Sequence, residues 1–105
     1  MAGSELPAKE DFSAALNQTF QVAAGDGSVF DLVLSAINSH VSSEQQENFS
    51  LLFRGPVEAP AKQGTYRLEN EELGSMDIFL VPVKKDEAGL YFEAVFNQFR
   101  EAAAR

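Results

Sequence analysis

The residues that most often carry enzymatic chemistry are scarce in this 105-residue chain, which has one histidine, His40, and no cysteine. Without cysteine there is no thiolate nucleophile, no disulfide and no cysteine-based zinc or iron–sulfur site. His40 opens a polar stretch with no second histidine near it, so we interpret it as a solvated loop residue. The Gly-x-Ser-x-Gly, phosphate-loop and His-Glu-x-x-His motifs are also absent. The sequence therefore predicts a non-enzymatic protein without a cofactor or a metal site.

Carboxylates gather around one predicted turn, where Glu69, Glu71 and Glu72 stand close together. Two carboxylates can form an acid–base pair, and several can bind calcium. The ligand spacing of a calcium-binding loop is missing here, and it is also missing around Asp26 and Asp31. We therefore interpret all these side chains as hydrated charges at hairpin turns.

Arg54 ends the most apolar predicted strand, directly before Gly55-Pro56, in a chain with few positive charges. Its planar guanidinium can bind a carboxylate through two hydrogen bonds. One interpretation is structural: Arg54 pairs with a turn carboxylate or a loop carbonyl and holds the rim of the fold together. Another is a contact with a partner's carboxylate. A hydrolase that uses Arg54 with an Asp or Glu is the weakest, because no positioned base or nucleophile is evident.

The segment Ile78–Val83 is apolar on both faces of a predicted strand. Such a strand is usually buried on both sides, yet Pro82 cannot donate to a ladder and belongs at an edge, a bulge or a strand end. The two rules agree only if the N-terminal helix, the C-terminal tail or another chain covers the outer face. The candidate partner-binding residues are therefore Arg54, Phe79, Val81 and Val83.

The chain is acidic, with 16 Asp and Glu against 8 Lys and Arg and a formal net charge of −8. Binding to nucleic acid or to an anionic membrane needs basic groups that face phosphates, so neither is an expected partner. No apolar run reaches the roughly 20 residues that span a bilayer. The N-terminus lacks the basic and apolar regions of a signal peptide, so we expect cytoplasmic synthesis.

Turn signals and alternating apolar residues predict a mostly β fold of about six antiparallel strands, forming a small barrel or sandwich with a short N-terminal helix. The helix follows Pro7, with Phe12, Ala15 and Leu16 on one face and Asp11 as its cap. The expected strands cover residues 19–24, 28–38, 49–53, 64–69, 76–83 and 90–97, joined as a meander.

The connections complete this prediction. Gly25-Asp26-Gly27 favours a type I′ hairpin turn, and the strand after it places Phe30, Leu32, Leu34 and Ala36 on one face. We expect a surface loop at His40–Asn48 and a charged turn at Lys84–Gly89. Residues 1–6 are predicted as a flexible arm, 7–97 as one β-rich domain and 98–105 as a helical or frayed tail. Residues 90–105 also fit a helix, through the spacing of Phe92, Phe96 and Phe99.

Five blocks stand in order along the chain: FSLLFRGP at 49–56, QGTYRLE at 63–69, LG at 73–74, FLVPV at 79–83, and Tyr91 followed by EAVFN at 93–97. Together they resemble a small bacterial family that is known only as a domain of unknown function. The resemblance covers residues 10–97 and departs from the family pattern at Phe92, which is inserted between the tyrosine and the glutamate. It implies a β-rich domain with no assigned activity, ligand or functional residue. Some members are encoded beside small proteins similar to phage tail-collar or tail-fibre proteins, which implies a structural or accessory role.

These observations favour a non-enzymatic protein-interaction or structural accessory module that binds a protein partner or self-associates. The resemblance adds a phage-tail-like or fibre-like bacterial assembly as its setting. The alternative is a small-molecule-binding β-barrel whose nine Phe and two Tyr residues line a cavity.

Overall fold

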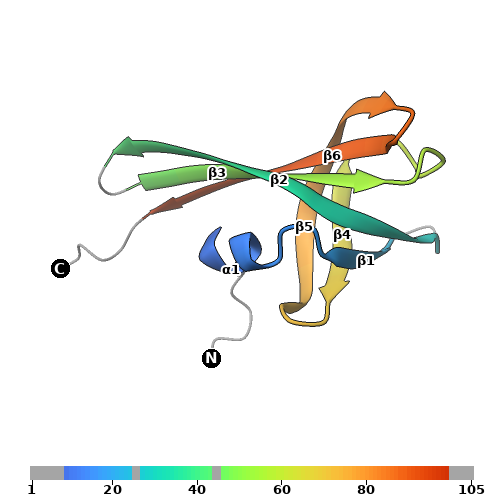
Figure 1. Cartoon of the computed structure of the whole chain (residues 1–105), viewed down its shortest axis with the longest axis horizontal. Coiled ribbons are helices and arrows are strands. Elements are labelled where there is room, and N and C mark those ends of the chain that lie inside the picture. Colours follow the sequence, from blue (N-terminus) through green and yellow to red (C-terminus); the bar gives the residue numbers. More distant parts are fainter. Residues whose placement is uncertain (1–8, 25–26, 44–45, 100–105) are drawn as a thin grey trace.

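The computed structural model describes residues 9–24, 27–43 and 46–99 of the chain (Figure 1). One helix and six strands follow in order: α1 (Lys9–Ala14), β1 (Thr19–Ala23), β2 (Val29–Ser43), β3 (Gln46–Gly55), β4 (Gly64–Asn70), β5 (Gly74–Asp86) and β6 (Gly89–Phe99). The strands close an antiparallel barrel in the order β1-β2-β3-β6-β5-β4. The predicted mostly β fold with a short N-terminal helix is confirmed, and of the two expected architectures it is the barrel.

The barrel consists of two three-stranded meanders, β1–β3 and β4–β6, which are joined along two seams. β3 pairs with β6 over ten residues, whereas β1 pairs with β4 over three. The single meander expected from the sequence is therefore wrong, because β3 and β4 are not neighbours in the sheet. The segment 56–63 contains Pro56 and Pro60, which cannot extend a ladder, and it carries the chain across to β4 as a Greek-key connection.

Alternate residues of all six strands point into the barrel and fill it. Phe20 packs edge-on against Phe53 with 5.3 Å between ring centroids, and Tyr66 packs against Phe92 at 6.0 Å. Burying one side chain of this size stabilises the fold by about 1.5–3 kcal/mol. The strands predicted to form the core contribute the buried residues Phe49, Leu51, Leu68, Ile78 and Leu80.

A β-bulge at Ser35 changes which residues of β2 face the interior. Leu34 is buried opposite Phe53, and beyond the bulge Ile37 packs against the core. Ala36, expected beside Leu34 on the inward face, lies instead on the outer face opposite Leu52. An extra residue in one strand turns every later side chain to the opposite face, which a simple alternation cannot anticipate.

α1 covers one end of the barrel, below the ends of β3 and β6 that project to the left in Figure 1. Phe12 is fully buried, its ring centroid 5.7 Å from that of Phe96, and Phe49 stacks on Phe96 at 4.9 Å. Asp11 lies inside the helix and is not its cap, because α1 begins before it. The chain leaves α1 through Asn17, whose φ of +72° is a conformation common where helices end.

Five of the six strands are longer than predicted, because ladder hydrogen bonds join backbones and need no apolar side chains. The expected loop at His40–Asn48 belongs to β2 and β3, apart from residues 44–45, which lie outside the described residues. The expected turn at Lys84–Gly89 is mostly strand, and Asp86 pairs with Gly89 across a two-residue turn. β6 continues to Phe99, so the helical alternative is wrong as far as that residue.

The described residues cover only part of the other predicted connections. The β1–β2 hairpin is confirmed, with the Ala24 N–H donating to the Ser28 carbonyl at 2.9 Å, but residues 25–26 of its turn lie outside the described residues. The same is true of residues 1–6 and 100–105. The β3–β4 connection is held by Tyr66, whose buried side chain donates a hydrogen bond from its hydroxyl to the Lys62 carbonyl.

Gly89 begins β6 in close contact with the end of β3. It has a φ of +152°, and a Cβ placed on it would lie 2.0 Å from the carbonyl oxygen of Gly55. We expect Gly89→Ala to lower the free energy of unfolding by about 2–4 kcal/mol, because the strands must separate locally to admit the methyl group. Urea denaturation measures this change. The control is Gly64→Ala, where a Cβ meets no atom within 4 Å. Equal losses in the two variants would contradict the steric explanation.

Candidate functional site

The predicted residue Arg54 lies in a row of side chains that crosses the outer surface of four strands. Val33 of β2, Arg54 of β3, Tyr91 of β6 and Lys84 of β5 are successive cross-strand partners, and such partners share one face of a sheet. The Lys84 ammonium lies 4.7 Å from the centre of the Tyr91 ring, within the range of a cation–π contact. The row therefore joins two cations and one aromatic ring on a single surface.

Arg54 itself is partly buried, and its alkyl stem lies over Gly89. Within residues 9–24, 27–43 and 46–99, its guanidinium makes no hydrogen bond or ion pair. The expected pairing with a turn carboxylate or a loop carbonyl is thus not found there. The head group keeps its donors available at the surface, while packing of the stem limits the directions in which they point.

The sequence left open how the apolar segment of β5 could be buried on both faces and still contain a proline. Ile78 and Leu80 point into the barrel, whereas Phe79 and Val83 are 52% and 48% exposed and Val81 is partly buried on the outer side. The strand is therefore buried on one face only. The sequence left three candidates to cover the outer face: the N-terminal helix, the C-terminal tail and another chain. The helix α1 does not cover it, because α1 packs against the buried rings of Phe49 and Phe96 at the end of the barrel.

Pro82 occupies one of the positions expected for a strand proline. A β-bulge separates the pairs that Pro82 and Lys84 make with β6. The pairing with β4 has already ended, because its last pair joins Leu80 to Gly64. β5 has a single strand neighbour here, so the missing N–H of proline costs little.

Val95 of β6 extends the same outer surface, and the sequence prediction missed it. Its side chain is 64% exposed, while Phe92, Ala94 and Phe96 beside it are buried. The alternation of apolar residues in 92–96 was the available signal, but it was obscured because the same residues fit a helix. We call Phe79, Val81, Val83 and Val95 the outer apolar face; Glu93, the cross-strand partner of Val81, lies among them.

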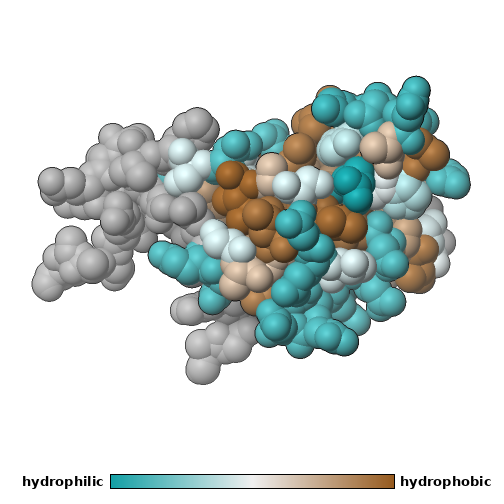
Figure 2. All heavy atoms as spheres, viewed as in Figure 1, coloured by the Kyte–Doolittle hydropathy of each residue, from teal (hydrophilic) through white to brown (hydrophobic). Residues whose placement is uncertain are grey.

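Apolar side chains reach the surface on β2 and β3 as well. Val33, Ala36 and Leu52 are partly buried residues of their outer sides. Figure 2 shows hydrophobic atoms gathered over the middle of the face on which β2 crosses the barrel, with hydrophilic atoms above and below them. The outer surface of the barrel is therefore apolar over more than one strand.

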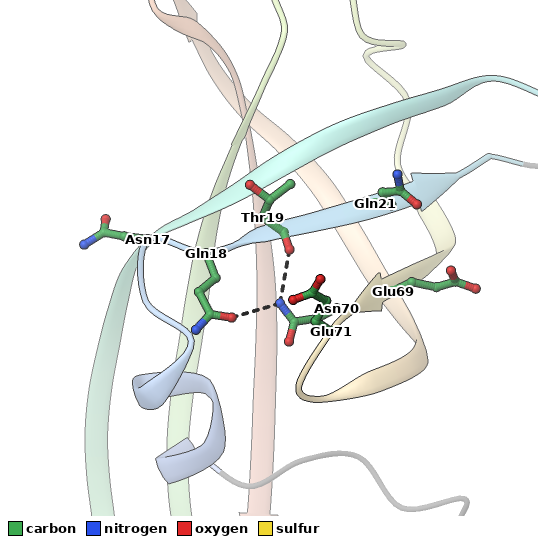
Figure 3. A pocket seen from close by; sticks show the side chains of 7 residues that line it. All are labelled: Asn17, Gln18, Thr19, Gln21, Glu69, Asn70 and Glu71. Atoms are coloured by element: carbon green, nitrogen blue, oxygen red, sulfur yellow. Dashed lines mark hydrogen bonds between the residues drawn. The ribbon is translucent and has the colours of Figure 1, made fainter.

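A polar groove lies where β1 meets β4, on the side of β5 away from β6 (Figure 3). It has a volume of about 660 Å³. Its lining comes from two distant segments of the chain: Asn17, Gln18, Thr19, Gln21, Glu69, Asn70 and Glu71. A smaller hollow of about 210 Å³ follows the same strands past Gln21 and Glu69 toward Val29 and Arg67.

Asn70 organises the groove and is a polar side chain that the barrel buries, with 7% exposed. Its amide nitrogen donates to Gln18 Oε1 at 3.2 Å and to the Thr19 carbonyl at 3.1 Å (Figure 3). Its amide oxygen accepts from the backbone N–H groups of Glu72 and Leu73 at 2.8 and 2.9 Å. Both donors and both acceptor positions are thus satisfied, which offsets the cost of burying the amide.

The acidic residues singled out in the sequence separate into different environments. Glu69 and Glu71 line the groove, and Glu72 accepts a hydrogen bond from Gln18 Nε2 at 3.4 Å. Asp31 is exposed on β2, and Asp26 lies outside the described residues. In the described part of the chain, no three His, Cys, Asp or Glu side chains are grouped so that they could hold a metal ion.

Arg67 and Asp77 form a cross-strand ion pair at the edge of the groove, with 2.5 Å between Nε and Oδ1. The hydrogen bond from Arg67, with its positive charge, holds the pKa of the Asp77 carboxyl below its ordinary value. An Asp whose folded pKa is lowered stabilises the fold above its unfolded pKa, and this contribution is lost as the pH falls through the folded pKa. Both side chains are more than half exposed, so solvent screens the contribution.

The other predicted features give no site. His40 is part of β2 and pairs through its backbone with Asn48. The small-molecule alternative needs a cavity among the aromatic side chains, and Phe20, Phe53 and Phe92 are core residues with no exposed surface. The groove and the smaller hollow lie at the β1–β4 seam and are lined mostly by exposed residues, with the buried Asn70 in the groove and the buried Val22 in the hollow.

These features define a six-stranded Greek-key barrel with a filled core, an outer apolar face and a polar surface groove. The chain belongs to the family described as a domain of unknown function (DUF6916), whose model matches residues 7–96. Neither the comparison with curated proteins nor that with solved structures gives a match. No helix in the described ranges has the length and apolar character needed to cross a membrane.

Asn70→Asp tests the role of the buried amide. The variant loses the two donated hydrogen bonds and places a carboxylate against two oxygen acceptors. We expect it to lower the free energy of unfolding by about 2–4 kcal/mol at pH 7, as for a buried group that loses its partners and gains charge. The loss should shrink in acid, because the introduced carboxyl has a raised folded pKa and, once protonated, can donate again. Urea denaturation at pH 7 and pH 4.5 measures both effects.

Gln21→Glu is the matched control, because it adds the same charge to the same groove at an exposed position. We expect it to lower the free energy of unfolding by less than about 1 kcal/mol, the cost of repulsion from its cross-strand neighbours Asp31 and Glu69. If both variants lost the same stability, added charge would explain the result and the hydrogen bonds of Asn70 would not.

Asp77 offers a direct measurement of the cross-strand ion pair. The Asp77 carboxyl carbon, followed by NMR, should titrate at lower pH in the native protein than in Arg67→Gln. The reason is that the glutamine removes the positive charge that stabilises the carboxylate. An unchanged Asp77 midpoint would show that the ion pair is not formed in solution.

Proposed function

We propose that this domain is a non-enzymatic protein-binding module whose partner packs on the outer apolar face. The observation that carries the proposal is the exposure of Phe79, Val83 and Val95 at 52%, 48% and 64% on two adjacent strands. Scattered exposed apolar residues are normal on a protein surface, but neighbouring ones on a sheet face are typical of an interface. A partner that buries them gains about 25 cal/mol for each Å² of apolar surface removed from water.

The polar residues around this face supply the orientation that apolar contact alone lacks. Glu93 lies beside Val81, and the row that contains Arg54, Tyr91 and Lys84 runs next to it. Arginine and tyrosine are enriched at the energetically dominant positions of protein interfaces. The unpaired head group of Arg54 suits a carboxylate of the partner, which would form two parallel hydrogen bonds with it.

We extend the proposal to the setting that the family resemblance implies. The domain would serve as an accessory or structural part of a phage-tail-like or fibre-like bacterial assembly, after cytoplasmic synthesis. Its filled barrel supports such a role, because a close-packed core presents a surface patch in a fixed geometry. Neither nucleic acid nor membrane is a proposed partner, since the net charge of −8 opposes contact with phosphates.

A double variant, Phe79→Ser with Val83→Ser, tests the proposal. Both side chains are about half exposed, so the fold should remain intact, as circular dichroism and thermal unfolding would verify. Tagged native and variant proteins are incubated with a lysate of the source organism, and captured proteins are identified by mass spectrometry. We expect at least one protein captured by the native domain to be reduced more than tenfold with the variant.

Val29→Ser is the matched control, because Val29 is 70% exposed but lies at the start of β2 beside the smaller hollow. The partner should be retained by this variant. Arg54→Ala should weaken its capture with at most a small loss of stability, because the head group has no partner among the described residues and only the alkyl stem packs over Gly89. If every captured protein binds equally to all four proteins, the outer apolar face is not the binding surface.

A further inference from the structure

Within the described part of the chain, the outer edge of β2 is open over most of its length. β2 has 15 residues, whereas its neighbour β1 has five and pairs only with residues 29–33 of β2. The turn between α1 and β1 adds one further contact, in which the Leu34 N–H donates to the Gln18 carbonyl at 3.1 Å and its carbonyl accepts from the Asn17 N–H at 2.8 Å. Beyond Leu34, β2 pairs with β3 alone among the described strands.

Beyond Leu34, three strands form a sheet that leaves the barrel on the left of Figure 1. We call this part of β2, β3 and β6 the projecting sheet, with β2 from Ala36 to Ser43 at its edge. An unpaired strand edge presents a row of backbone donors and acceptors that another strand can complete. The matching partner is therefore an extended segment of polypeptide.

The direction of the free backbone groups follows from the register. Leu34 is buried opposite Phe53, and its N–H and C=O point toward β1. Ile37 and Ser39 lie opposite Leu51 and Phe49, which are also buried, so they share the inward face with Leu34. In an antiparallel sheet, residues that share a face of one strand direct their backbone groups to the same side. Ile37 and Ser39 therefore offer their N–H and C=O groups at the open edge.

Among the described residues, this edge lacks the features that usually prevent strand pairing. Natural edge strands are protected by charged side chains, by proline or by a covering segment. The sequence from Val33 to Ser43 contains no Asp, Glu, Lys, Arg or Pro, although 23% of the whole chain is charged. In a protein of net charge −8, this uncharged strip is a place where two copies can approach each other with little repulsion.

We propose that two copies of the chain pair through the β2 edges of their projecting sheets, antiparallel across a twofold axis. The same edge serves on both protomers, so the interface is self-complementary and closes as a dimer. The backbone groups of Ile37 and Ser39 in one protomer bond to the β2 edge of the other. The projecting sheets then form one continuous sheet through both protomers. This surface is separate from the outer apolar face, and the two proposals stand independently.

The first test measures mass and uses backbone-specific variants. Size-exclusion chromatography with light scattering should give twice the chain mass of 11.5 kDa for the native protein at about 50–100 µM. Ser39→Pro removes one edge N–H but keeps the ladder to β3, so it should be monomeric with an unchanged circular dichroism spectrum. Ser39→Ala keeps the N–H and should remain dimeric. The double variant Phe79→Ser with Val83→Ser should remain dimeric as well.

The second test is amide hydrogen exchange followed by NMR. The Ile37 and Ser39 amides should become protected as the protein concentration rises, whereas Asn38, which faces β3, should be protected at every concentration. A native protein that is still monomeric at about 100 µM would overturn the proposal. A dimer that survives Ser39→Pro, or dissociates with Ser39→Ala, would also overturn it, because its interface would not depend on the backbone edge of β2.

Discussion

Closure of the barrel depends on the short seam between β1 and β4. Three residue pairs form its ladder, and the side chain of Asn70 continues it by donating to the Thr19 carbonyl, where a strand would otherwise supply an N–H. The same amide holds the β4–β5 turn through Glu72 and Leu73. One buried side chain therefore fixes a turn and a seam together. If the seam opened, the inward faces of both strands, including Phe20 and Leu68, would meet water.

The shortness of β1 has two consequences that lie on different sides of the molecule. It limits the seam with β4, so a polar groove forms where the ladder ends and Asn70 takes over. It also leaves β2 without a neighbour beyond Leu34, so that a sheet of three strands leaves the barrel. The filled core lies between the groove and this three-stranded sheet, and its close-packed rings, such as Phe20 and Phe53, resist rearrangement.

Prediction from the sequence succeeded where turn chemistry and alternation agreed. Phe49–Phe53 and Tyr66–Leu68 are core strands, as their alternating apolar residues predict. The prediction failed where backbone hydrogen bonds, and no pattern of side chains, determine the structure. Examples are the polar strand residues at His40–Asn48 and the bulge at Ser35. The groove could not be predicted, because it joins segments that are distant in the chain. Asn70, whose side-chain amide links these segments, resembles an ordinary turn residue in the sequence.

The Greek-key connection sets the order in which contacts can form. Hairpins within β1–β3 and within β4–β6 join residues close in the chain, whereas Asn70 and Thr19, which meet at the seam, are 51 residues apart. The entropy of closing a long loop must be lost before such contacts stabilise anything. We therefore expect the two halves to gain local structure before the β1–β4 seam forms. On the same ground we expect barrel closure, and with it the full burial of the aromatic core, to come last.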